Sequence, residues 1–266
     1  MFEITIFDFK KNLKGKIGLS VILIGLVSLI IGLFPSIQES GFSFEEYIQN
    51  LPPALAEAFG ATIANYSTIE GFLGMEFYSW FWTVALGAYF AYKGGSLISG
   101  EIETKRIDLV LSSPLTRSRY FVEKFLSYVP DAFLFNIILG LSVYVGSFLI
   151  NETISPILLA KVHFLSIPFW LACSAIGGVF SVFIDEERRA KLFATGFIFI
   201  AYIIETITVQ SDFSFLGKMS FTHYYKPITI LSTGEIDLIN PLILSMATLV
   251  IVFISLIAFE KKDIQT

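Results

Sequence analysis

The chain has 266 residues, of which 55% are hydrophobic and only 15% are charged, and its formal net charge is −5. About a quarter of the residues in a soluble domain are charged, so this composition excludes a disordered chain and argues strongly against a water-soluble enzyme. The acidic balance argues against a nucleic-acid-binding protein, and the single cysteine, Cys173, excludes an internal disulfide. The composition is typical of a polytopic membrane protein.

Six apolar stretches approach or exceed the length needed to cross a bilayer, which takes about 20 mostly apolar residues. The predicted spans are residues 17–34, 72–92, 128–150, 163–184, 192–209 and 241–259. The first could be mistaken for a signal peptide, but its apolar run is long and no small-residue cleavage pattern follows, which favours a retained anchor. We therefore expect an all-α fold, with residues 1–266 forming a single transmembrane domain.

The distribution of Lys and Arg predicts the orientation of these spans. Of the 18 basic residues, 15 fall on one side, and only Lys161, Lys218 and Lys226 fall on the other. Cytoplasmic loops are the ones enriched in Lys and Arg, so both termini are predicted to be cytoplasmic, in a multi-pass protein of the cell (plasma) membrane.

Three segments outside the spans have predicted structures. Apolar residues recur near the N-terminus at spacings of four, three and four, which predicts an interfacial helix (an elbow along the membrane) rather than the strand that alternation over 2–6 would allow. The outer loop 35–71 is expected to form short helices, with a capping-box spacing at Ser43 and Glu46; an exit gate is the alternative. The aromatic segment 210–240, with His223, Tyr224 and Tyr225, is predicted to fold back into the outer leaflet as a re-entrant segment before the last span.

The segment 97–117 carries the most information. Acids and bases alternate there at helical spacing, for example Glu101 and Lys105, which supports an exposed helix. Apolar residues such as Ile102 and Leu109 sit among these charges, and Pro114 ends the element. From composition alone, docking on a partner protein and an ordinary amphipathic loop are about equally favoured.

At this point the sequence resembles a family. The Glu-x-Glu pattern at Glu101 and Glu103, followed by Asp108 and by Ser112-x-Pro114-x-Thr116-Arg117, is similar to a signature of the permease subunits of type-2 ATP-binding-cassette (ABC-2) transporters. Three further regions agree with this family in order and place: Leu51-Pro52-Pro53-Ala54-Leu55 with Phe59-Gly60, the aromatic run 221–227 with Gly234-Glu235, and the C-terminal run 259–264. The chain departs from the family at Lys105-Arg106, where Gly-Thr is frequent.

The resemblance implies a coupling helix over residues 101–111, between the second and third spans, seated in a groove of a separate ATPase subunit. Its expected contact residues are Glu101, Ile102, Glu103, Lys105, Arg106, Asp108, Leu109, Pro114 and Arg117. The loop 185–189 would be a second cytosolic contact. The resemblance also implies a pair of permease chains, identical or paralogous, each with an ATPase below it.

Two kinds of site are missing from the sequence. No Gly-x-x-x-x-Gly-Lys-Ser/Thr motif is present, so ATP and Mg²⁺ are expected on the partner ATPase and this chain is not expected to be an enzyme. His163 and His223 lack companion ligands at metal-site spacing, so no metal or cofactor is expected on this chain.

Three acids fall within or near the ends of predicted spans: Glu76, Asp131 and Glu205. A charge at the bilayer centre costs about 2.5–3.5 kcal/mol on insertion scales, so each is a candidate for a polar pathway, with an interface-level or helix-packing role as the alternative. They support the competing hypothesis of an ion- or proton-coupled secondary transporter or channel without an ATPase. A membrane enzyme is disfavoured, because Glu76 and Asp131 are expected near opposite faces. The favoured hypothesis is an ATP-driven ABC permease, expected to export.

Overall fold

The computed structural model describes residues 3–39, 67–108, 112, 115–208 and 213–264. Within these ranges the chain is helical and has no strand, which confirms the predicted all-α class. In chain order the elements are α1 (Glu3–Lys11), α2 (Leu13–Glu39), α5 (Ile69–Leu73), the π-helix η1 (Gly74–Ala85), α6 (Leu86–Gly94), α7 (Ser99–Glu103), α9 (Arg117–Leu126), α10 (Tyr128–Leu149), α11 (Pro156–Phe183), α12 (Glu187–Thr208), α13 (Ser214–Gly217), the 3₁₀ helix η2 (Phe221–Tyr224), α14 (Pro227–Thr233) and α15 (Ile239–Lys261). The short helices predicted within 40–66 lie outside the described residues.

Five helical stretches are long and apolar enough to cross a membrane: 13–39, 117–149 (α9 with α10), 156–183, 187–208 and 239–261. Each covers most of a predicted span and extends beyond it at one end or both. Large apolar side chains face outward along them; Leu29, Phe148 and Ile207 are each more than 70% exposed. Outward-facing apolar surface of this extent suits a lipid environment and not water. The structure is that of a helical membrane protein.

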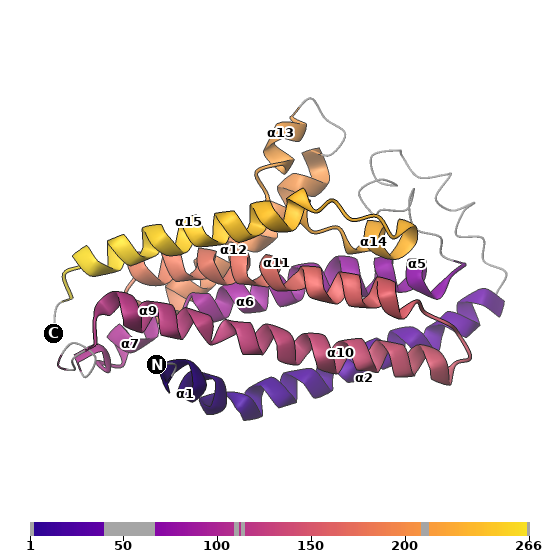
Figure 1. The fold of residues 1–266 in the computed structure, drawn as a ribbon, viewed down its shortest axis with the longest axis horizontal. Coiled ribbons are helices and arrows are strands. Elements are labelled where there is room, and N and C mark those ends of the chain that lie inside the picture. Colours follow the sequence, from indigo (N-terminus) through magenta and orange to yellow (C-terminus); the bar gives the residue numbers. More distant parts are fainter. Residues whose placement is uncertain (1–2, 40–66, 109–111, 113–114, 209–212, 265–266) are drawn as a thin grey trace.

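The predicted span 72–92 is not one of these five. There the chain forms three helices, α5, η1 and α6, whose 5, 12 and 9 residues follow one another without a gap. The middle element is a π-helix, a form that proteins use mostly as single turns and frequently at functional sites. The Thr83 hydroxyl donates to the carbonyl oxygen of Tyr78, five residues earlier, at 2.7 Å. In Figure 1 the combined segment runs along the bundle from the end with α14 to the end with α7.

Helix α11 is the centre of the fold. In its apolar stretch 67% of the residues are buried, against 17–33% in the other four, and it packs on α6, α10, α12 and α15. Its contact with α6 is made through glycines: a Cβ on Gly94 would lie 2.2 Å from the carbonyl oxygen of Ser174, and one on Gly177 would lie 2.2 Å from that of Ala91. Small residues let membrane helices approach until their backbones touch.

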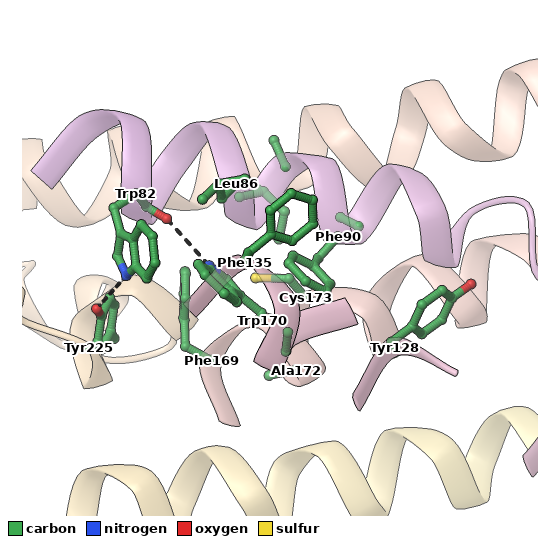
Figure 2. Packing of buried hydrophobic residues seen from close by; sticks show 14 of the residues in the cluster. Trp82, Leu86, Phe90, Tyr128, Phe135, Phe169, Trp170, Ala172, Cys173 and Tyr225 are labelled. Carbon is green, nitrogen blue, oxygen red and sulfur yellow. Dashed lines mark hydrogen bonds between the residues drawn. The ribbon is translucent and has the colours of Figure 1, made fainter. Parts of the chain in front are cut away.

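Aromatic rings fill the core between this helix and its neighbours. Figure 2 shows Trp82 between Tyr225 and Trp170. The Trp82 indole donates to the Tyr225 hydroxyl at 2.8 Å, and the Trp170 indole donates to the Trp82 carbonyl at 3.3 Å. Trp170 also stacks on Phe90 at 4.9 Å between ring centroids. Because each buried indole N–H has an acceptor, these large rings can be buried without loss of a hydrogen bond.

Residues 3–11 form helix α1, as their apolar spacing predicted, and not a strand. It is anchored on α9: the Thr5 hydroxyl donates to the Glu123 carbonyl at 2.6 Å, and the Ile4 N–H donates to the Glu123 carboxylate at 3.3 Å. Its position along a membrane surface stays a prediction.

Candidate functional site

One end of the molecule collects charged side chains from helices that are distant in sequence. Helices α1, α7 and α9, the first turn of α12 and the last turn of α15 meet there, and both chain termini lie toward this end (Figure 1). We call it the basic end. It contains most of the residues that the sequence assigned to a coupling segment.

Helix α7 is anchored to the central helix by one hydroxyl group. Ser181 of α11 accepts hydrogen bonds from the backbone N–H groups of Ile98 and Ser99, at 2.6 and 2.9 Å. The first N–H groups of a helix have no partner within the helix, so a buried helix start needs an acceptor of this kind. Ser181 is buried, and it places the coupling segment against the end of α11.

Glu101 is the hub of an ion-pair network. Its carboxylate lies 2.8 Å from the Lys124 ammonium and 3.0 Å from the Arg106 guanidinium. Lys124 also lies 3.9 Å from Asp8, so the network connects α7, α9 and α1. Burial alone would raise the pKa of Glu101, but the charges and hydrogen bonds of Lys124 and Arg106 outweigh it and lower that pKa. Glu101 is therefore held as a carboxylate.

In the described residues the coupling segment is not the single exposed helix expected over 101–111. Helix α7 ends at Glu103, and Lys105 has a left-handed backbone with φ 54°. A left-handed residue ends helical geometry, so Lys105 leaves the α7 face and the expected pairing of Glu101 with Lys105 is wrong. Glu101 pairs instead with Arg106 and Lys124 and is buried.

Two other residues of the segment stabilise helix ends. The Glu103 carboxylate accepts the backbone N–H of Glu187, the first residue of α12, at 2.7 Å. The Arg117 guanidinium donates to the carbonyl oxygens of Phe259 and Lys262, at 3.2 and 2.7 Å, where α15 ends. A carboxylate at the start of a helix and a cation at its end each interact favourably with the helix dipole and stabilise the helix. The segment therefore joins α12 and α15 as well as α9 and α11.

The remaining predicted contact residues differ in exposure. Lys105, Arg106 and Asp108 are exposed, whereas Ile102 is half-buried and packs against the core. Leu109 and Pro114 lie outside the described residues. The exposed surface of the segment is therefore a small charged tip whose base is fixed to the bundle.

A second buried ion pair lies close to this network. The Lys16 ammonium of α2 pairs with the carboxylate of Asp131 in α10, and their side chains are 2% and 3% exposed. Lys16 also donates to the Phe9 carbonyl at 3.0 Å and lies over the Phe9 ring. Asp131 thus holds α2 and α10 together and does not extend into solvent.

A third buried cluster is neutral and lies among η1, α10 and α11. The Tyr78 hydroxyl lies 2.9 Å from Nε2 of His163, and Nδ1 of His163 lies 3.0 Å from Oδ1 of Asn136. The Asn136 amide nitrogen donates to the Ala132 carbonyl, so its oxygen faces the histidine. Nδ1 of His163 therefore donates to Asn136, and in the neutral ring Nε2 accepts a hydrogen bond from the Tyr78 hydroxyl.

All three predicted residues of the outer aromatic segment have polar contacts, and Tyr225 is the one of them that is fully buried. Tyr225 is buried and its hydroxyl donates to the Val162 carbonyl at 3.0 Å. Nδ1 of His223 lies 3.6 Å from the Glu205 carboxylate, which also accepts the Thr222 hydroxyl. Tyr224 donates from its hydroxyl to the Lys218 carbonyl at 2.7 Å.

The three acids of the predicted spans lie in separate environments, and a pathway role for them stays a prediction. Asp131 is paired with Lys16, Glu205 is bonded to η2, and Glu76 is exposed on η1. Across the described ranges no three His, Cys, Asp or Glu residues are grouped to hold a metal ion.

Sequence analysis missed the pairing of Lys16 with Asp131 and the helix-end contacts of Glu103 and Arg117. The partners lie 115, 84 and about 142 positions apart, so no local spacing could indicate them. A lysine at the start of one predicted span and an aspartate at the start of another were the only available signal.

Comparison of this chain with models of known protein families, with curated proteins and with solved structures gave no match.

Proposed function

We propose that this chain is the membrane-spanning permease subunit of an ATP-driven transporter of the ABC-2 type, coupled to a separate ATPase subunit. The resemblance of residues 101–117 and of three further regions to that family motivates the proposal. A helical membrane protein with no phosphate-binding loop in its sequence is compatible with it.

The observation that carries the proposal is the way the tip 103–108 is attached. Its base is bonded to α9 through Glu101 and to α11 through the contact of Ile98 and Ser99 with Ser181. Glu103 adds a bond to the first residue of α12. A displacement of the exposed tip would therefore be transmitted to three helices at once, which is what a contact point for an ATPase requires.

The proposal includes six crossings, with 69–94 as the second. Its three consecutive helices together exceed the length of about 20 residues that a crossing needs. With six crossings the basic end is cytoplasmic, in the cell membrane, as the 15-to-3 distribution of basic residues favours. The working unit is a pair of chains with one ATPase each, and the direction of transport is export.

The test co-expresses this chain with a candidate ABC-type ATPase subunit and reconstitutes both in lipid nanodiscs. Two single variants, Lys105→Glu and Asp108→Lys, each reverse one exposed charge of the tip. Each should lower the ATP hydrolysis that this chain stimulates in the ATPase at least tenfold, while the unfolding temperature of the chain stays unchanged. Lys10→Glu, an exposed charge on α1, is the matched control and should retain stimulation.

Unchanged stimulation in both variants would show that the tip is not the contact. Solute movement by the purified chain alone, driven by an ion gradient without ATP, would instead establish the competing transporter hypothesis.

A further inference from the structure

A polar cavity of about 260 Å³ lies inside the basic end. It is lined by side chains of α1, α6, α7, the α9–α10 helix and the first turn of α12, with Tyr92, Tyr128 and Asn12 among them. A water molecule occupies roughly 30 Å³ in the liquid, so the cavity has room for a polyatomic ion and not only for a single water.

Basic residues outnumber acidic residues in the lining of this cavity. Its lining carries five basic residues and four acidic ones, namely Lys11, Lys93, Arg106, Lys124, Lys191, Asp8, Glu101, Asp131 and Glu187. The lining therefore carries one more basic residue than acidic residues. Lys16, which is not part of the lining, pairs with Asp131 and neutralises its charge.

Every acid of the cavity has a basic partner. Glu101 pairs with Lys124 and Arg106, Glu187 with Lys191, Asp131 with Lys16, and Asp8 with Lys124. Lys11 and Lys93 form no ion pair among the described residues. Lys93 is half-buried, so its charge has lost part of its hydration; Asp131 and Asp8 attract it, but neither forms an ion pair with it. A cation would find no unpaired carboxylate here, whereas an anion would find two unpaired ammonium groups.

We propose that this cavity is a binding site for a phosphate group, held by Lys93 and Lys11. A phosphate monoester carries close to two negative charges at neutral pH, which the ammonium groups of Lys11 and Lys93 can balance, and its oxygens accept strong charge-assisted hydrogen bonds. The Asn12 side chain adds a neutral donor at the same wall. The shared chemistry is a phosphate dianion, supplied either by a lipid headgroup or by free phosphate from solution. The site does not require that an ATPase docks on the tip.

The first arm of the test titrates inorganic phosphate into the full-length chain in a neutral detergent at constant ionic strength. Binding to the folded state should raise the unfolding temperature, read from tryptophan fluorescence, along a saturable curve. Lys93→Gln and Lys11→Gln should each raise the half-saturating concentration roughly tenfold or more, because each removes a charge-assisted bond. Lys93→Arg should keep binding. Lys14→Gln, an exposed lysine of α2 outside the cavity, is the matched control and should bind as the wild type does.

The second arm reconstitutes the chain in vesicles of phosphatidylcholine with one tenth phosphatidic acid, extracts it, and measures the retained phosphatidic acid by mass spectrometry. Saturation in the first arm alone identifies free phosphate as the ligand, and retention that Lys93→Gln abolishes identifies the lipid headgroup. The proposal is overturned if neither arm shows saturable binding, or if both Lys→Gln variants match Lys14→Gln. Lys11 is exposed, so its variant keeps the test valid even if Lys93→Gln fails to fold.

Discussion

The molecule contains two kinds of buried polar cluster. At the basic end, Lys16 with Asp131 and Glu101 with Lys124 join helices through full charges. Among η1, α10 and α11, by contrast, Tyr78, His163 and Asn136 are joined by neutral hydrogen bonds. Both connect segments distant in sequence. The stability contributed by charged groups depends on pH and, where they are partly exposed, on salt, whereas that of a satisfied neutral network depends little on either. The stability of the basic end is therefore expected to change with pH and salt, and the stability of the aromatic core is expected to stay constant.

The largest effect is expected from breaking the Lys16–Asp131 pair. Lys16→Ala leaves an uncompensated carboxylate at a site where the side chains are nearly inaccessible. Removing one partner of a buried pair costs about 3–5 kcal/mol, so the free energy of unfolding, measured by denaturant titration in mixed micelles, should fall by that order. The double variant Lys16→Met with Asp131→Leu should recover most of it, because no buried charge remains.

Lys14→Ala, two positions away and exposed, is the control for this experiment and should change the unfolding free energy by less than about 0.5 kcal/mol. An equally small effect of Lys16→Ala would contradict the buried pairing.

A smaller, pH-dependent effect is expected at Glu101. Its pKa is lowered in the folded state, so its contribution to stability is complete above the ordinary value of 4.5 and is lost as the pH falls through the folded pKa. At pH 7, Glu101→Gln should lower the unfolding free energy by about 1.5–3 kcal/mol, the range for hydrogen bonds to charged groups. The difference from the wild type should shrink when unfolding is followed below pH 4.5. A difference independent of pH would rule out the ionised network.

The neutral cluster provides the contrast. Tyr78→Phe removes the donor to His163 and leaves Nε2 without a partner in a buried site. A loss of about 1–3 kcal/mol is expected from such an unsatisfied group. This loss should be the same in low and high salt, whereas salt should weaken the ion pair of Glu101 with the partly exposed Arg106. Tyr144→Phe on the exposed face of α10 is the matched control and should be neutral. Strong salt dependence for Tyr78→Phe would remove the distinction between the clusters.

The smallest effect is expected at Glu103. Glu103→Ala removes the acceptor for the first N–H of α12, and loss of a helix-start acceptor costs about 0.5–2 kcal/mol. The change should be confined to that helix, with faster amide hydrogen exchange at 187–190 and unchanged exchange in α10. Uniform acceleration across the bundle would mean that Glu103 has a global role.

Composition and periodicity predicted the helical membrane class and five of the apolar helices, because burial in lipid selects long uncharged runs. They did not predict the π-helix at Gly74–Ala85, since its residues read as an ordinary apolar run. Helix α2 continues through Pro35 to Glu39, five residues beyond the predicted span 17–34.

The candidate site was chosen from the sequence, and its geometry was not predicted. The charges around Glu101 indicated a special segment, yet its partners Lys124 and Ser181 come from other helices and local spacing carries no information about them. The turn at Lys105 was missed because a left-handed conformation is unusual for a lysine. Roles in coupling and transport remain predictions that the experiments above address.

The glycine contact between α6 and α11 has a mechanical consequence. The backbones of α6 and α11 touch at Gly94 and Gly177, so no side chains separate the two helices there. Ser181 of α11 also accepts a hydrogen bond from the backbone at the start of α7. Under the proposed coupling role, a displacement of the tip is therefore expected to move α7, α11 and α6 together and not α7 alone.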